Sequence, residues 1–462
     1  MYLSNKTPQE KFYQVRKDFQ VFYFESFEIQ EENNEINIVF HFSIDRKIFF
    51  NPEIKFPYNA FFDKSQLLDK EQLNSIVFHM GMIELISYWK SACPPIIHLV
   101  PFSLTEEQQA FWRKIYFHGL GEFFHINKIE TNINDFFQFR FENENVFSKI
   151  DLPKTSDVMI PVGGGKDSVV TLEIIREMNL KAVPFIINPR AASFQSAMAA
   201  GYSENEIIVI NRTIDNQLLQ LNKEGFLNGH TPFSAMLAFS GILVAFCCKI
   251  PNMALSNESS ANEASIIGTN INHQYSKSFE FETDFRNYVH ENLSKDFNYY
   301  SLLRPLSELQ IAALFSKTDK YNLVFKSCNV GSKDDIWCCN CSKCLFTYIM
   351  LSPFIKAETM LSIFGENLFE KASLWNTLLE LSGQTEEKPF ECVGTIEEVN
   401  IALCEIIKQK QNVKLPILLQ KYMESESYQK YNMLNFNDLL KEFNSEHHLP
   451  VEQFEFISKK LA

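Results

Sequence analysis

The residues best suited to chemistry stand at 158–168, which reads Val-Met-Ile-Pro-Val-Gly-Gly-Gly-Lys-Asp-Ser. An apolar run enters three glycines, and a helix-like run follows Ser168. Where a strand turns through glycine into a helix, backbone N–H groups can approach an anion closely, and the helix N-terminus adds partial positive charge. A glycine-rich turn without a ligand is the alternative. Because three glycines cost conformational entropy on folding, the segment favours a phosphate site.

Two common nucleotide motifs do not fit this segment. The Walker loop ends in Gly-Lys-Ser/Thr, whereas Asp167 separates Lys166 from Ser168 here. The dinucleotide motif Gly-x-Gly-x-x-Gly would need glycine in place of Ser168. The pattern that fits is Gly-Gly-x-Asp-Ser, which resembles the pyrophosphate loop of the ATP pyrophosphatase superfamily. Those enzymes split ATP into AMP and pyrophosphate, and they usually carry Ser where this chain has Gly163.

The resemblance implies a role for each residue of the loop. The glycine amides and Lys166 would hold phosphate, Asp167 would orient magnesium or the loop itself, and Ser168 would donate a hydrogen bond to phosphate. On this basis we expect ATP and Mg²⁺ to bind. The predicted cofactor-binding residues are Gly163, Gly164, Gly165, Lys166, Asp167 and Ser168.

A cluster of cysteines further along the chain indicates a metal site. Cys338, Cys341 and Cys344 follow the pattern Cys-x2-Cys-x2-Cys, and Cys328 precedes them by ten residues. Four thiolates can close a tetrahedral zinc site with no open position, so we expect a structural zinc ion. The spacing resembles the zinc site of 7-cyano-7-deazaguanine synthase, a member of the same superfamily. Cys339 could replace Cys338, and the alternatives to zinc are unrelated reduced cysteines or a redox role.

Several polar residues outside the loop could transfer a proton or bind an anion. Glu258 and Glu263 follow a predicted strand, where they could hold magnesium, move a proton or cap a helix. His230 precedes a predicted helix and fits a substrate role and a plain loop position equally well. His273 and Lys277 could grip an anionic substrate or lie in a solvated loop. The catalytic candidates are therefore Asp167, Ser168, Lys166, His230, Glu258, Glu263, His273 and Lys277.

Hydrophobic patterning predicts the elements that position these residues. From 157 to about 330, strand-like and helix-like segments alternate, which predicts a doubly wound parallel sheet with helices on both faces. Ligands bind such sheets at the carboxyl ends of the strands, where the glycine loop begins. The predicted strands cover 157–162, 182–187, 206–210, 252–256 and 322–326. The predicted helices cover 167–178, 193–200, 213–223, 232–249 and 306–316.

The regions on either side of this alternation have different patterns. Two aromatic and β-branched segments near the N-terminus flank a polar turn and predict a hairpin, and further strand and helix patterns follow them. The N-terminal hairpin strands are 21–27 and 35–43, with helices at 69–90 and 104–118 and a strand at 96–100. We therefore predict an α+β domain at 1–150, the ATP-binding domain with the cysteine cluster at 151–345, and a mostly helical region at 346–462.

Composition excludes some functional classes. The chain has 462 residues, enough for two or three domains. A net charge of −14 without a long basic stretch argues against a nucleic-acid partner. The N-terminus lacks the apolar core of a signal peptide, and the longest apolar run, 233–248, is shorter than the roughly 20 residues that cross a bilayer. We expect that run to form a buried helix, and we expect a cytoplasmic protein without a membrane partner.

Five motifs occur together in one order, and the set is more specific than any member. They resemble those of the ATP-dependent UDP-N-acetyl-muramoyl-L-alanyl-L-glutamate epimerases of bacterial peptidoglycan synthesis. The motifs are Pro161–Ser168, Asn228–Phe233, Ser256–Glu263, Trp337–Cys344 and Lys388–Thr395. The resemblance implies an adenine nucleotide alpha hydrolase-like sheet and conversion of the terminal L-Glu of UDP-MurNAc-L-Ala-L-Glu to D-Glu, with ATP cleaved to AMP and diphosphate.

Two other functions stay open at this point. One is a related ATP-dependent enzyme that modifies nucleobases or thiolates tRNA, which the acidic balance disfavours. The other is a zinc-stabilised regulator that binds nucleotide without turning it over, which the intact Asp167-Ser168 pair disfavours.

Overall fold

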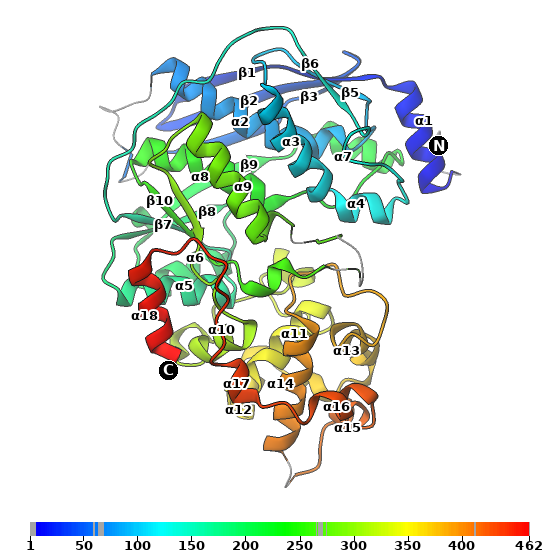
Figure 1. Ribbon diagram of the computed structural model, residues 1–462, viewed down its shortest axis with the longest axis vertical. Coiled ribbons are helices and arrows are strands. Elements are labelled where there is room, and N and C mark those ends of the chain that lie inside the picture. The colour runs from blue at the N-terminus through cyan, green and yellow to red at the C-terminus, as the bar shows by residue number, and fades with distance from the viewer. Residues whose placement is uncertain are drawn as a thin grey trace. The chain divides into compact units, whose positions relative to one another are not determined.

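The computed structural model describes residues 6–58, 61–62, 69–264, 266, 271–273, 275–410 and 413–461 (Figure 1). The chain forms two compact units that are interleaved in sequence. Unit 1 comprises Met1–Asp157, Ile208–Met253 and Tyr275–Asn298. Unit 2 comprises Val158–Ile207, Ala254–Gln274 and Tyr299–Ala462. The glycine loop and the cysteine cluster both belong to unit 2.

Unit 1 contains a mixed sheet with the strand order β9-β4-β2-β1-β5-β6, and β3 pairs with β2. The predicted hairpin is confirmed, because β1 and β2 pair antiparallel around Asn33 and Asn34, which both have positive φ. β5 runs parallel to β1 and to β6. The strands are β1 (Val21–Glu32), β2 (Glu35–Ile44), β3 (Ile48–Phe50), β4 (Glu53–Pro57), β5 (Ile96–Leu99), β6 (Gln138–Phe141) and β9 (Ile208–Thr213).

The core of unit 1 is built around two long buried helices that pack against each other, α2 and α8. The predicted buried helix at 233–248 is confirmed as α8. No helix among the described residues combines the length and the apolar character that crossing a membrane would require. The helices of this unit are α1 (Pro8–Asp18), α2 (Lys70–Trp89), α3 (Glu106–Gly119), α4 (Gly121–Ile126), α7 (Asn216–Lys223), α8 (Phe233–Cys248) and α9 (Phe279–Asn292).

Neighbouring strands in unit 2 have the order β11-β10-β7-β8. β7 and β8 are parallel, and α5 connects them. β10 and β11 each begin in unit 1 and end in unit 2. α10 packs directly on α5, and the first residues of the two helices, Glu308 and Lys166, form an ion pair. The elements are β7 (Val158–Pro161), β8 (Ala182–Ile187), β10 (Asn252–Leu255), β11 (Asn298–Ser301), α5 (Lys166–Glu177), α6 (Ala191–Ala199) and α10 (Glu308–Phe315).

The rest of unit 2 is helical, as its pattern predicts. α11 packs against α10, α13 and α14, so it joins the helical region to the helix that carries Glu308. The helices are α11 (Ser342–Leu351), α12 (Ala357–Phe364), α13 (Trp375–Leu381), α14 (Ile396–Gln409), α15 (Ile417–Met423), α16 (Glu426–Tyr431), α17 (Phe436–Leu439) and α18 (Val451–Leu461).

Two sequence-based expectations of the fold are wrong. The predicted strand at 322–326 is a turn, because its amides satisfy local partners and the glycine loop: Val324 N–H donates to Tyr321 O, and Lys326 N–H donates to Gly164 O at 2.8 Å. The expected all-parallel sheet is also corrected. The predicted strand at 206–210 is β9, which pairs antiparallel with β4, a strand that the pattern did not reveal. The fold class is nevertheless α/β.

Candidate functional site

The glycine loop joins β7 to α5 and is fixed by close packing on both sides. Gly164 has φ +84°, and a Cβ built there would lie 2.6 Å from the backbone of Ala192 and Ser193, so the start of α6 packs on this glycine. A Cβ at Gly165 would lie 2.8 Å from Ser327 Oγ. Gly165 is also the N-cap of α5 and makes no side-chain cap hydrogen bond. The first turn of α5 therefore presents amides suited to an anion.

Substitutions at Gly164 and at Gly163 should differ sharply in their effect on stability. Gly164→Ala should destabilise the protein by about 2–4 kcal/mol, because it adds backbone strain to a steric clash. Gly163→Ser is the control, since a Cβ there meets nothing within 4 Å and serine is the residue that the pyrophosphate loop usually carries. Thermal melts of both variants test this. Equal melting temperatures would show that the loop is not packed as described.

Lys166 is the first residue of α5, and its ammonium is buried rather than open to solvent. The residue is 1% exposed, and its Nζ pairs with the carboxylates of Asp167 and Glu308. Burial alone would lower the pKa of Lys166, but the two carboxylates outweigh burial and hold the pKa above its ordinary value. Ser168 Oγ donates to Gly165 O at 3.0 Å. Without nucleotide, both side chains thus have protein partners.

Three carboxylates gather beside this lysine. Oxygen atoms of Asp167, Glu258 and Glu308 lie within 4.8 Å of one another. Glu258 follows β10, and Arg304 Nη1 donates to its carbonyl at 2.7 Å. Glu308 is the first residue of α10, and its N–H donates to Glu398 Oε1 at 2.5 Å. We call Asp167, Glu258 and Glu308 the acidic cluster.

The electrostatics of the acidic cluster favour a cation. The pKa of Glu308 is raised to about 8, mainly by burial; Asp167 and Glu258 contribute to the increase, and Lys166 opposes it. Three carboxylates facing one ammonium leave an excess of negative charge when all are ionised. Carboxylate oxygens are the ligands that Mg²⁺ prefers, and the donor set therefore fits a divalent cation.

The remaining predicted residues divide between the two units. Glu263 lies in unit 2, where it pairs with Lys388, and half-buried His273 is in unit 2 as well. His230 precedes α8 in unit 1, with Nδ1 3.8 Å from Glu122 Oε2. Lys277 ends a short 3-10 turn, also in unit 1. The structure thus brings Lys166, Asp167 and Glu258 together in one unit.

Three charged residues of this region, Glu308, Glu398 and Lys388, were not among the predicted site residues, although Lys388 begins one of the five motifs. Glu308 follows Ser307 in an ordinary capping box with Gln310, so its sequence signal is that of any helix start. Glu398 likewise completes a capping box with Thr395. A glutamate at a helix start shows a second role only when its neighbours in space are known.

The cysteine cluster has the dimensions of a tetrahedral metal site. The Sγ atoms of Cys328, Cys338, Cys341 and Cys344 lie within 4.8 Å of one another, with separations of 3.9 Å for Cys328–Cys341 and 3.8 Å for Cys338–Cys344. A zinc ion about 2.3 Å from each sulfur would separate the sulfurs by about 3.8 Å. Gly331 N–H donates to Cys328 Sγ at 3.1 Å. All ten cysteines lie in the described part of the chain, and none of them is in a disulfide bond.

The structure separates Cys339 from this set. Its Sγ donates to Phe364 O at 3.2 Å, and its backbone has φ +53°. Cys338, rather than Cys339, therefore completes the group of four.

Comparison with known proteins places these residues in a family. Residues 13–302 match the MurL N-terminal domain, and residues 324–434 match the MurL C-terminal domain. The chain belongs to the MurL family. The loop and Glu258 lie in the first match and the cysteine cluster lies in the second, whereas Glu308 falls between the two.

Three curated MurL relatives carry the name UDP-N-acetyl-alpha-D-muramoyl-L-alanyl-L-glutamate epimerase. The protein of Xanthomonas oryzae pv. oryzae is 32% identical over 398 residues, which is 83% of this chain and 85% of that protein. The protein of Micromonospora sp. is 34% identical over 75% of this chain and 78% of its own length. The protein of Salinispora tropica is 33% identical over 72% and 73%. No solved structure matches this chain.

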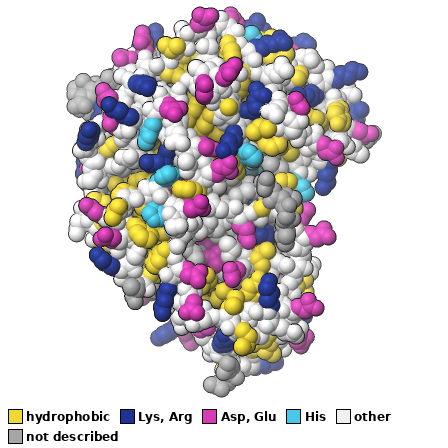
Figure 2. All heavy atoms as spheres, in the orientation of Figure 1, with side chains coloured by type: hydrophobic (Ala, Val, Ile, Leu, Met, Phe, Trp, Pro, Cys, Tyr) yellow, Lys and Arg dark blue, Asp and Glu magenta, His cyan; other side chains and the backbone are white. Residues whose placement is uncertain are grey.

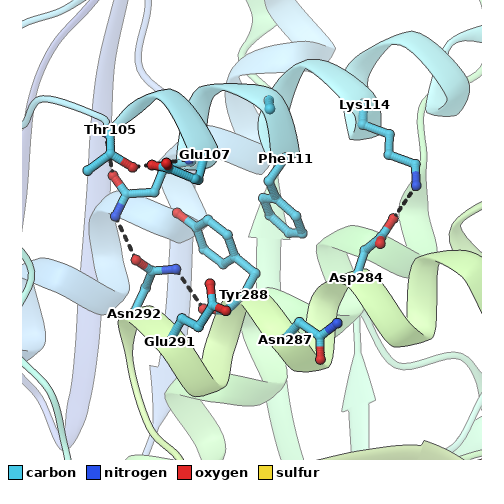
Figure 3. Close-up of a pocket in the computed structure, with 11 residues that line it drawn as sticks. Thr105, Glu107, Phe111, Lys114, Asp284, Asn287, Tyr288, Glu291 and Asn292 are labelled. Carbon is cyan, nitrogen blue, oxygen red and sulfur yellow. Dashed lines mark hydrogen bonds and ion pairs between the residues drawn. The ribbon is translucent and has the colours of Figure 1, made fainter.

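A cleft in unit 1 of this MurL chain is a poor site for a diphosphate. It has a volume of about 480 Å³ and lies between α3 and α9 (Figure 3). Lys114 Nζ is 2.6 Å from both Glu280 Oε1 and Asp284 Oδ2, so the charge of this lysine is already neutralised. Phe111 stacks on Tyr288 with ring centroids 3.8 Å apart. More carboxylates than cations line the cleft, which disfavours an anionic nucleotide.

The surface charge of this MurL chain is mixed. On the face shown in Figure 2, Lys and Arg side chains are interspersed with Asp and Glu side chains. The expectation that nucleic acid is not a partner stays a prediction from the net charge of −14.

Proposed function

We propose that this protein epimerises the terminal L-Glu of UDP-MurNAc-L-Ala-L-Glu to D-Glu, with cleavage of ATP to AMP and diphosphate, in cytoplasmic peptidoglycan synthesis. The observation that carries the ATP part is the glycine loop beside the acidic cluster, both in unit 2. The substrate part rests on the relatives, which are named for this dipeptide.

Carboxylate adenylation explains why an epimerase would need ATP. A free α-carboxylate resists loss of the α-proton, because the product would carry two negative charges. Joining the carboxylate to AMP removes one of them and makes the α-hydrogen more acidic. A base then removes the proton, the carbon regains a proton on its other face, and water releases AMP.

The site residues divide this work in the proposal. Amides of the loop and the start of α5 bind the phosphates, and Lys166 contributes its charge once nucleotide competes with its carboxylate partners. Asp167, Glu258 and Glu308 would hold magnesium. Bound Mg²⁺ would neutralise phosphate charge during the transfer. Ser168 can rotate its hydroxyl from Gly165 O toward a phosphate oxygen.

The zinc ion has a structural part in the proposal. Cys328, Cys338, Cys341 and Cys344 would bind it with sulfur ligands only, which leaves no open position for catalysis. Cys341 is the N-cap of α11, and Cys344 lies in its first turn. The ion would therefore fix the start of α11, which packs on α10 behind Glu308.

The decisive experiment measures diphosphate release by the purified protein with ATP, Mg²⁺ and single candidate substrates. We expect release with UDP-MurNAc-L-Ala-L-Glu and conversion of its terminal residue to D-Glu. Release only with tRNA or a nucleobase precursor would replace this proposal with a nucleobase-modifying or thiolating enzyme. Nucleotide binding without any release would indicate a regulator.

A further inference from the structure

A buried lysine and a more exposed glutamate form an ion pair that the ATP half of the proposed reaction does not use. Lys388 Nζ contacts Glu263 Oε2, and it also donates to Gly394 O at 2.9 Å. The lysine side chain is 5% exposed, whereas the glutamate side chain is 35% exposed. The carboxylate is thus the member of the pair that a ligand can reach, and the ammonium is a fixed charge behind it.

One short turn connects Glu263 of the pair to the acidic cluster. Glu258, a member of the cluster, is the N-cap of the 3-10 turn Ser259–Asn262, and Glu263 is its C-cap. Asn444 Nδ2 donates to Ser259 Oγ at 2.9 Å, and Ser259 N–H donates to Leu306 O. These hydrogen bonds hold the turn, so Glu263 stays at a set position relative to Glu258.

Close packing around Gly394 connects Lys388 of the pair to the same cluster. Gly394, whose carbonyl accepts from Lys388, would place a Cβ 3.1 Å from Glu308 Cγ and 3.1 Å from Glu398 Oε2. A side chain at position 394 would force Glu308 or Glu398 to shift by a few tenths of an ångström. Gly394 therefore lies between the two groups: its carbonyl accepts a hydrogen bond from the Lys388 ammonium, and its Cα packs against Glu308 of the cluster.

A backbone bridge aligns the two segments that carry the pair. Ile266, three residues after Glu263, pairs antiparallel with Glu387, which directly precedes Lys388. The 3-10 turn and the glycine contact thus connect the pair to the acidic cluster, and the bridge aligns the two segments that carry the pair. An adenylated glutamate held at the cluster would have its α-carbon within a few bonds of the reacting phosphate.

We infer that Glu263 and Lys388 carry out the proton transfer of the proposed reaction. Glu263 Oε takes the α-proton of the adenylated glutamyl residue, so the C–H bond breaks, an O–H bond forms, and the electron pair becomes an enolate. When Glu263 takes the proton its own charge is neutralised, so the positive charge of Lys388 behind it offsets the negative charge of the enolate. Water supplies a proton to the opposite face, and Glu263 loses its proton to solvent, so the balance closes without another reactant.

This inference rests on the proposed function, and one pair of measurements separates the two. Diphosphate release reports adenylation, and incorporation of deuterium from D₂O at the α-carbon reports proton transfer. Glu263→Gln should keep substrate-dependent diphosphate release and lose deuterium incorporation by about 100-fold or more, because an amide is not a base. Calorimetry without ATP should show unchanged binding of UDP-MurNAc-L-Ala-L-Glu.

The role of the Lys388 charge is tested by substitutions that remove or keep that charge. A second ion pair of unit 2 serves as the control. Lys388→Met should also lower deuterium incorporation while release continues, and Lys388→Arg should restore part of the incorporation. The control is Glu366→Gln, which breaks the Lys371–Glu366 pair of 2.9 Å elsewhere in unit 2 and should change neither signal.

Each result has a clear meaning. Full deuterium incorporation by Glu263→Gln overturns the inference and leaves the proposed function standing. Loss of diphosphate release and deuterium incorporation together, or loss of substrate binding, also overturns it, since Glu263 would then act in adenylation or recognition. Absence of substrate-dependent diphosphate release by the wild-type protein overturns the proposed function itself.

Discussion

Replacing Glu308 with glutamine should lower substrate-dependent diphosphate release by about 100- to 1,000-fold, the usual effect of removing one group that stabilises transition-state charge. Glutamine keeps the shape of the side chain but removes the anionic oxygen that would bind Mg²⁺. The substitution also removes one of the two carboxylates that contact Lys166. Steady-state release at saturating ATP, measured over a range of Mg²⁺ concentrations, would show the loss and a weaker response to magnesium.

The fold should survive this substitution. Because burial raises the pKa of Glu308, a neutral side chain costs less there than at an exposed position. Glu173→Gln is a matched control, since Glu173 is a buried carboxylate of α5 whose partners are Arg176, Lys320 and Tyr321. A Glu308→Gln protein with wild-type release would remove Glu308 from the site.

The same pKa fixes the direction of two pH effects. Mg²⁺ needs an ionised carboxylate, so its affinity should fall about tenfold per pH unit as the pH drops below about 8. Stability without metal changes in the opposite sense. The raised pKa means that the native state keeps a proton that the unfolded chain releases above 4.5, so this contribution is complete below pH 4.5 and is lost as the pH rises through about 8. Thermal melts with and without Mg²⁺ would separate the two effects.

What the sequence could predict depends on how local each feature is. The glycine loop and the cysteine pattern each occupy a short stretch, so residue types and spacing were enough to select them. Glu308 and Lys388 come from distant segments that meet the loop region only through the packing of α10 on α5 and of Gly394 on Glu308. One sequence cannot show such meetings, because each residue looks locally like a helix start or a polar loop.

The errors in the predicted fold have the same origin. Residues 322–326 carry the apolar run of a strand, yet the amide of Lys326 binds the glycine loop instead of a neighbouring strand. β11 and α9 were not predicted, since Asn298–Ser301 is a short strand and Phe279–Asn292 mixes aromatic with charged residues. Tertiary packing decides which strands pair with each other. For this reason the sequence did not show that β9 pairs with β4.

Replacing Cys341 with serine should strongly destabilise unit 2. Cys341 Sγ lies 3.9 Å from Cys328 Sγ, and it belongs to the four sulfurs that would share one ion. A serine hydroxyl is a poor zinc ligand at neutral pH, so the ion would be lost along with its contribution to folding. We expect a decrease of more than about 4 kcal/mol in the free energy of unfolding, the size of effect that follows loss of a metal site. Metal analysis and thermal melts of the purified protein would measure both losses.

Cys339 supplies the control that distinguishes a metal site from a merely compact thiol cluster. It lies beside Cys338 in sequence, but its Sγ donates to Phe364 O instead of facing the other sulfurs. Cys339→Ser should therefore keep one zinc ion per chain and lose only about 1 kcal/mol, the worth of one altered hydrogen bond. A wild-type protein that contains no zinc and melts at the same temperature after chelator treatment would contradict the assignment. Because the ion would act through α11 and α10, its loss should also weaken Mg²⁺ binding at Glu308, although no sulfur touches the nucleotide site in this proposal.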